Sequence, residues 1–318
     1  MHVRAGLPAV RGAGPGQVDV HQHLWPPALI DALLARTAPP HLTIDDGGTW
    51  TLHLPGEPPY GVRPEDHDVV ARQSLETGTA LALVALSSPL GLEDLPAHEA
   101  VPLLDAWHAG AAELPEPFGA WAAVCRLDPD LAELKDRLAA GFAGLQVPAT
   151  WLATPAALER LAPVLEICER ADRPVLVHPG PVSARDDADL PGWWPALVDY
   201  PAQLQAAWWA WHTEGRTVLP GLRIGFAAGA GLAPLHHERL RARGGRPRPI
   251  DGDVFVDTSS YGAQAVDALV RALGIDAIVL GSDRPYAQRG DFRSAMGKAA
   301  AHAVETTNPR RFLMGGRP

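Results

Sequence analysis

The chain has 318 residues, of which 47% are hydrophobic, so it can build a full buried core and is not disordered throughout. Its formal net charge is −10 and it has no block of lysine and arginine, which argues against nucleic acid or an anionic membrane as a partner. No apolar stretch approaches the ~20 residues of a membrane span, and the Gly/Pro/Arg-rich N-terminus lacks the apolar centre of a secretory signal. We therefore expect a soluble, cytoplasmic protein with a flexible arm over residues 1–16 and a small-molecule substrate.

Short runs with strand character follow this arm and alternate with amphipathic helical patterns. The predicted strands are 17–22, 80–87, 118–126, 142–147, 174–179, 222–227, 253–258 and 276–283. The clearest helical patterns cover 129–140, 156–171, 202–215 and 265–273. Strands that alternate with helices pair in parallel through right-handed crossovers. The pattern predicts an α/β fold, a (β/α)₈ TIM barrel over residues 17–318, with a doubly wound open sheet as the alternative.

Two segments depart from a minimal barrel. After the first strand, alternating residues flank an Asp-Gly-Gly sequence, which predicts a small β-hairpin insertion at about 41–56, beside the barrel mouth. Between strands five and six, Leu204, Trp208 and Trp211 recur at helical spacing and predict a helix packed on the barrel. Trp194 lies between strand five and this helix, where it is a candidate for covering a site.

Three of the predicted strands end in side chains that bind metals. Side chains alternate along a strand, so His21 and His23 share one face at the end of strand one. His178 ends strand five and Asp283 ends strand eight, and the carboxyl ends of barrel strands are where active sites lie. Each residue alone is more simply explained as a hydrogen-bonded core side chain. Their conjunction predicts one divalent metal, most readily Zn²⁺, with a position left for water.

These motifs resemble the amidohydrolase superfamily, in the branch that contains aminocarboxymuconate-semialdehyde decarboxylase, from about residue 18 to residue 313. The stretch "DVHQHLWP" is similar to the family's HxH signature, "LVHPGP" to its strand-five histidine and "LGSDRPY" to its strand-eight aspartate. "LPGLRIGFAAGAGLAPLHHER" and "VFVDTSSYG" resemble its sixth and seventh strands. The resemblance implies a single catalytic metal. Strand four ends in "LQVPAT", without the lysine that bridges two metals in other members, which agrees with that implication.

The chain departs from this family at the end of strand six. The resemblance implies a histidine there that acts on the metal-bound water, and this chain has Ala228 at the matching position. His236 and His237 follow on the next helix. We expect both to lie at the surface, with a return of one of them into the site as the alternative.

Arginines that match substrate-binding positions of the family are also present. The resemblance implies that Arg63, after the β-insertion, and Arg239, on the helix after strand six, bind a substrate carboxylate. It further implies that Arg239 acts across the interface of a homodimer. Surface positions are the alternative for both, and Arg126 and Arg284 are further candidates near strand ends.

Three functions fit these observations. The first is metal-dependent hydrolysis of a small carboxylated or cyclic metabolite, in which Asp283 accepts the proton of a metal-activated water and returns it to the leaving group. The second is non-oxidative decarboxylation of a small carboxylic acid. The third is a barrel that binds a metal or ligand without catalysis, for which Ala228 is the only support.

Overall fold

The computed structural model describes residues 14–183, 190–249, 251–288 and 290–315, so the arm predicted over residues 1–16 lies almost wholly outside the described residues. Parallel strands form two sheets, with the orders β1-β5-β6 and β11-β10-β9-β8-β7. Each of these strands overlaps one of the predicted runs. Their bounds are β1 (Gln17–Gln22), β5 (Thr79–Val84), β6 (Phe118–Ala120), β7 (Leu145–Pro148), β8 (Val175–His178), β9 (Ile224–Phe226), β10 (Val254–Asp257) and β11 (Ile278–Val279).

Backbone hydrogen bonds join the two sheets at both of their edges. The Ala122 N–H donates to the carbonyl of Gly144 at 2.9 Å, which links the chain after β6 to β7. The Val20 N–H donates to the carbonyl of Leu280 at 2.9 Å, which links β1 to the chain after β11. The strands therefore close on themselves, and the predicted TIM barrel is confirmed.

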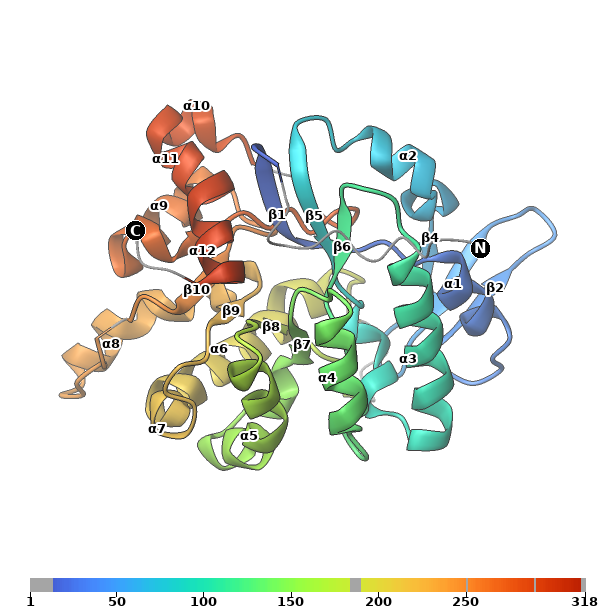
Figure 1. Ribbon diagram of the computed structural model, residues 1–318, viewed down its shortest axis with the longest axis horizontal. Helices are drawn as coiled ribbons and strands as arrows, with labels where there is room; N and C mark the ends of the chain where they lie inside the picture. The colour runs from blue at the N-terminus through green and yellow to red at the C-terminus, as the bar shows by residue number, and fades with distance from the viewer. Residues whose placement is uncertain (1–13, 184–189, 250, 289, 316–318) are drawn as a thin grey trace.

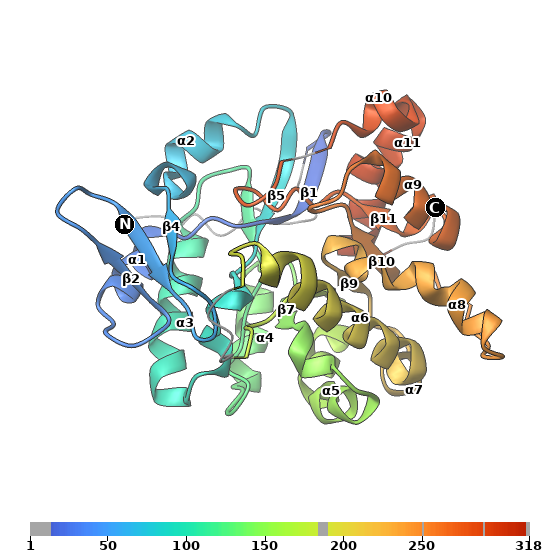
Figure 2. The ribbon, with the colours of Figure 1, turned by 180° about the vertical axis from the view of Figure 1, so that it is seen from behind.

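Helices cover the outside of the barrel (Figures 1 and 2). The helix predicted from the tryptophan pattern is α6, and Trp208 and Trp211 are buried with exposures of 0% and 2%. Among the described residues, no helix has the length and hydropathy needed to cross a membrane. The helices are α1 (Pro27–Leu34), α2 (Val69–Ser74), α3 (Ala97–Ala112), α4 (Leu131–Ala139), α5 (Pro155–Arg170), α6 (Tyr200–Ala210), α7 (Arg216–Val218), α8 (His237–Ala242), α9 (Ala263–Leu273), α10 (Phe292–Met296), α11 (Lys298–His302) and α12 (Asn308–Met314).

The interior of the barrel is packed with apolar side chains, so the site can only form above them. This inner cluster includes Val18, Leu81 and Leu176, and Phe312 from α12 joins it. A Cβ atom at Gly225 would lie 2.7 Å from the Phe312 ring, so only glycine leaves room for the ring at this point of β9. A larger apolar cluster fills the space between the strands and the helices.

The insertion after β1 is a small antiparallel sheet at the side of the barrel (Figure 1). The predicted hairpin consists of β2 (His41–Ile44) and β3 (Trp50–His53). Its turn is held by Asp45, whose Oδ1 accepts the N–H groups of Gly47 and Thr49 at 2.9 Å each. A third strand, β4 (Tyr60–Val62), pairs with β3 and was not predicted.

Candidate metal centre

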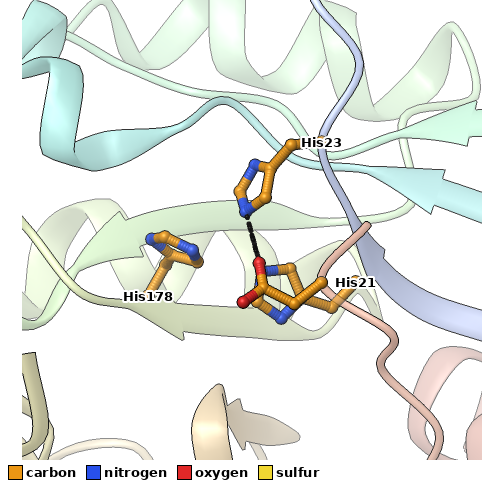
Figure 3. A group of neighbouring side chains, drawn as sticks. His21, His23 and His178 are labelled. Atoms are coloured by element: carbon orange, nitrogen blue, oxygen red, sulfur yellow. Dashed lines mark hydrogen bonds and ion pairs between the residues drawn. The ribbon is translucent and has the colours of Figure 1, made fainter. Parts of the chain in front are cut away.

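The four predicted ligands meet at the carboxyl ends of β1, β8 and β11. One ligand atom from each of His21, His23, His178 and Asp283 lies within 4.8 Å of the others. The three imidazole rings are 4.9–5.0 Å apart and nearly perpendicular to one another, as Figure 3 shows. All three histidines are at most 5% exposed. The structure thus brings together the complete set of metal ligands expected from the sequence.

The protein fixes the orientation of each imidazole through its Nδ1 atom. Nδ1 of His21 lies 2.7 Å from the carboxylate Oδ2 of Asp257. Nδ1 of His23 lies 3.0 Å from the carbonyl oxygen of Ala85, and Nδ1 of His178 lies 2.8 Å from that of Pro179. A carboxylate or a carbonyl can only accept a hydrogen bond, so each Nδ1 carries the proton and each Nε2 keeps its lone pair.

These lone pairs face one another and a carboxylate. Nε2 of His21 is 3.1 Å from Nε2 of His23, which is in turn 3.2 Å from Oδ1 of Asp283. Such short distances between acceptors need a positive charge between them, which is a proton in the metal-free protein and which a metal cation can replace. Three imidazoles and one carboxylate are a suitable donor set for a divalent metal, and the outer partners of the Nδ1 atoms are those that metal-bound histidines use. The residues present therefore fit one divalent metal ion.

Burial and neighbouring groups shift the pKa values of His21 and Asp283 in opposite directions. Burial raises the pKa of Asp283, but its hydrogen bond to His23 and the nearby histidines outweigh burial and bring the pKa to about 2. Burial lowers the pKa of His21, and the carboxylates of Asp257 and Asp283 reverse this and raise it to about 9. Asp283 is therefore ionised at neutral pH and can accept a proton.

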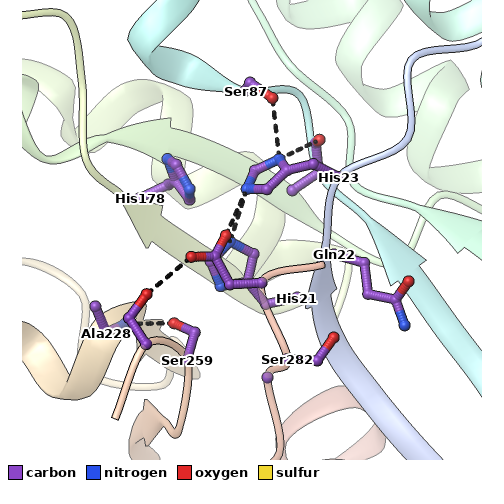
Figure 4. Close-up of polar contacts among 12 residues, drawn as sticks. His21, Gln22, His23, Ser87, His178, Ala228, Ser259 and Ser282 are labelled. Atoms are coloured by element: carbon purple, nitrogen blue, oxygen red, sulfur yellow. Dashed lines mark hydrogen bonds and ion pairs between the residues drawn. The ribbon is translucent and has the colours of Figure 1, made fainter. Parts of the chain in front are cut away.

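Asp257, at the end of β10, is a site residue that the sequence reasoning missed. Its Oδ2 holds His21, while its Oδ1 accepts hydrogen bonds from the backbone N–H of Ala228 at 2.8 Å and from the hydroxyl of Ser259 at 2.6 Å. The part of this network around Ala228 and Ser259 is drawn in Figure 4. A carboxylate at a strand end, in the same position as Asp283, was the available signal.

The end of strand six carries no imidazole, and the strand register identifies the residue involved. Phe226 pairs with Val177 on one side and with Val256 on the other. The next residue, Ala227, is therefore level with His178 and Asp257 and follows the same alternation into the barrel. Ala228, assigned to this position from the resemblance, is one residue further along, at the start of a 3₁₀ segment. The inward-facing residue is thus Ala227, because the strand ends one residue earlier than the motif match implied.

The histidines after strand six lie away from the metal cluster. His236 is exposed. His237 is 5% exposed and packs in the helix layer, with its ring 4.8 Å from that of His212 and 5.4 Å from that of Trp209. The return of His237 into the site is excluded by this packing, and so is the surface position expected for it.

The predicted substrate-binding residues do not contact the metal ligands through any hydrogen bond or ion pair found among the described residues. Arg63 is 75% exposed and pairs with Asp66. Arg239 is exposed on α8, which projects from the opposite side of the molecule to the β2–β4 sheet (Figure 1). Trp194 is half-buried and stacks on Trp193 with ring centroids 5.8 Å apart.

The two alternative arginines are engaged elsewhere. The guanidinium of Arg126 pairs with Asp94 and is 49% exposed. Arg284 follows Asp283 in the chain but turns its guanidinium to the buried Glu76, at 2.8 Å. Arg284 therefore forms a structural ion pair with Glu76 and does not point at the metal ligands.

A second group of metal-binding side chains, not predicted from the sequence, lies between α3 and α4. Asp105, His108 and Glu133 each place one ligand atom within 4.8 Å of the others. Here the backbone N–H of Ala123 donates to Nε2 of His108 at 3.1 Å. Arg137 pairs with both carboxylates, at 3.4 Å and 2.7 Å.

Known proteins share both sequence and fold features with this chain. The profile of the protein family described as "Amidohydrolase" matches residues 18–313. A comparison with curated protein sequences finds no match. Solved structures with the same fold include IDCase from Metarhizium anisopliae in its apo form, with 18% identity, a TM-score of 0.75 and coverage of 94% of this chain and 97% of that one.

Two further structures share the fold across nearly their whole length. The 5-carboxyvanillate decarboxylase LigW from Sphingomonas paucimobilis has 18% identity, a TM-score of 0.70 and coverage of 94% of this chain and 99% of that one. A 5-carboxyvanillate decarboxylase from Novosphingobium aromaticivorans, solved with bound manganese, has 18% identity, a TM-score of 0.62 and coverage of 97% of both chains.

Proposed function

The chain belongs to the amidohydrolase family, and on that premise we propose that it releases CO₂ from a small carboxylic acid in a metal-dependent, non-oxidative reaction. The observation that carries the proposal is the cluster of His21, His23, His178 and Asp283 at the barrel mouth. The decarboxylases among the solved structures that share this barrel support decarboxylation over hydrolysis, which the sequence alone placed first.

In the proposed site His21, His23 and His178 would hold the metal through their Nε2 atoms, together with the carboxylate of Asp283. A bound divalent ion supplies positive charge that orients and polarises the oxygens of the substrate. Decarboxylation breaks the bond between a carbon and its carboxyl group, CO₂ leaves, and the carbon takes up a proton in its place. Asp283 lies beside the three histidines, so in the proposed reaction it would accept a proton from water or a substrate hydroxyl and deliver it to that carbon.

We propose Zn²⁺ as the metal, because three imidazoles and a carboxylate suit it and because such sites bind zinc more tightly than manganese. Manganese in one structural neighbour makes it the alternative. Metal-free protein reconstituted with each ion in turn distinguishes them. The proposal for zinc predicts tighter binding of Zn²⁺ in competition with Mn²⁺, and equal or tighter binding of Mn²⁺ contradicts it.

We propose that the enzyme acts as a homodimer in which Arg239 serves the site of the partner. The support is that α8, which contains Arg239, and the β2–β4 sheet, which Arg63 directly follows, lie on opposite sides of the molecule (Figure 1). We infer that the two arginines reach one substrate only if they come from two chains. Mixing the inactive variants Arg239→Ala and Asp283→Asn tests this, since a mixed dimer has one site with both residues intact. Recovery of activity on mixing is expected, and no recovery from a mixed dimer contradicts the shared site.

The reaction is tested with a panel of aromatic acids, lactones and amides, in which CO₂ release is measured beside acid release. Hydrolysis is the second candidate. The lack of an imidazole at the end of strand six favours it, because the resemblance to the decarboxylase branch implies a histidine there and hydrolysis needs no acid–base group beyond Asp283. CO₂ release that Asp283→Asn abolishes supports decarboxylation, whereas acid release supports hydrolysis. The absence of any turnover by fully metal-loaded protein favours the non-catalytic barrel.

A further inference from the structure

Ser260 faces Asp283 across the ends of β10 and β11. The hydroxyl of Ser260 donates to Oδ2 of Asp283 at 3.0 Å. The other carboxylate oxygen, Oδ1, is the one directed at His23, at 3.2 Å. The hydrogen bond of Ser260 therefore occupies one oxygen of Asp283 and leaves the other to the cluster.

Both residues have an unfavourable backbone conformation. The φ angle is 62° at Ser260 and 57° at Asp283, in the left-handed region that glycine adopts at least cost. Ser260 is exposed, so its hydroxyl satisfies no buried group other than the carboxylate. Non-glycine residues in this region cost energy and cluster at functional sites. Local stability alone would favour glycine here.

We infer that Ser260 is a positioning residue for Asp283, which it holds in the rotamer that presents Oδ1 to the metal. Its effect on turnover rests on the proposed function, whereas its effect on metal binding does not. The neighbouring Ser259 supports the same reading, because its hydroxyl holds Asp257, the partner of His21. Two successive serines after β10 thus hold two of the carboxylates around one metal.

The test uses Co²⁺ as the probe, because its visible absorption reports the geometry of its ligands and needs no substrate. Ser260→Ala removes the hydroxyl and keeps the backbone strain, whereas Ser260→Gly removes both. Loss of an outer partner of a metal ligand costs about 10–100-fold in affinity, and we expect about tenfold weaker Co²⁺ binding and an altered spectrum in both variants. Thermal unfolding of the metal-free variants should match that of the wild type for alanine and exceed it for glycine.

Ser294 provides the matched control. Its hydroxyl donates to Oδ2 of Asp291 at 2.6 Å, in the same type of pair but at the exposed start of helix α10, outside the site. Ser294→Ala should leave Co²⁺ affinity and the spectrum unchanged. Wild-type affinity and spectrum in both Ser260 variants would overturn the inference, as would wild-type binding in Ser260→Gly alone, which would show that Asp283 keeps its orientation without the hydroxyl. A failure to find any decarboxylated substrate would leave these metal-binding results standing.

Discussion

Histidine and carboxylate side chains come together both at the barrel mouth and in the group of Asp105, His108 and Glu133, which lies in a groove between α3 and α4. Of these two clusters, the one at the barrel mouth has histidine nitrogens whose lone pairs are available to a metal. At the mouth, acceptors bind every Nδ1, so every Nε2 is available. In the groove, the N–H of Ala123 donates to Nε2 of His108, so its Nδ1 carries the proton and has no partner. A metal at that Nδ1 would need a doubly deprotonated ring.

The carboxylates of the two clusters differ in the same way. Asp283 meets two histidines and no arginine, whereas Arg137 already pairs with Asp105 and Glu133. Both carboxylates of the second cluster therefore already have an arginine of the protein as their cationic partner, whereas Asp283 has none among the described ion pairs. The comparison predicts that the hydrogen-bond partners of the ligands, more than the ligand types, decide which cluster binds a metal.

The largest expected effect follows from removing one ligand from each cluster. His178→Ala should weaken metal binding by more than the roughly 10–100-fold that an outer partner contributes, because it deletes a direct ligand. His108→Ala should leave metal content unchanged. Elemental analysis of both purified variants measures this, and loss of metal from His108→Ala would show that the groove is the binding site.

A smaller effect is expected from Asp257→Asn. The asparagine has one oxygen and one amide group, while Asp257 accepts on both oxygens. If the amide faces His21, it donates to Nδ1 and moves the ring proton to Nε2, towards the metal. If it faces Ala228, two donors oppose each other. We expect metal affinity to fall about 10–100-fold in a competition titration, and an unchanged affinity would contradict the role given to the Nδ1 partners.

The last effect is the contribution of His108, in the groove, to the pH dependence of stability. Burial, followed by the charge of Arg137, lowers the pKa of His108 from 6.5 to about 3. The folded state therefore binds fewer protons than the unfolded state between these values. The contribution of His108 to stability is complete above about pH 6.5 and is lost as the pH falls towards about 3.

His108→Gln removes this titration. The free energy of unfolding should then depend less on pH, by up to about 1.4 kcal/mol per pH unit between about pH 6 and about pH 4. Denaturant unfolding at several pH values measures the slope. His98→Gln is the control, because His98 lies on the same helix with its side chain 81% exposed. Equal slopes in the wild type and His108→Gln would mean that His108 is protonated in the fold.

The strand pattern was enough to predict the barrel and the residues that come together at its mouth. His21, His23, His178 and Asp283 each end a run of strand character, and parallel strands bring such ends together. Strand β4 has only three residues, too few to show an alternation, so it could not be predicted. Asp257 ends its strand as Asp283 does, but it holds a ligand instead of the metal, a distinction that depends on which oxygen meets which ring.

The roles of single residues in long-range contacts could not be read from the sequence. His108 lies inside a helix, away from any strand end, and its partner Ala123 belongs to a segment after that helix. Arg284 stands beside a ligand in the sequence but turns to Glu76, which comes from a different part of the chain. The motif match assigned the position of the missing histidine to Ala228. The pairing of Phe226 with strands β8 and β10 shows instead that Ala227 is the residue that faces into the barrel.

The most direct test of the proposed metal site is a crystal structure of the protein soaked with Zn²⁺, with anomalous differences measured at the zinc edge. We expect a peak at the barrel mouth, bounded by Nε2 of His21, His23 and His178 and by Oδ1 of Asp283. We expect no peak between Asp105, His108 and Glu133. A peak in the groove, or an empty barrel mouth at saturating Zn²⁺, would contradict the claim that the Nδ1 partners decide where the metal binds.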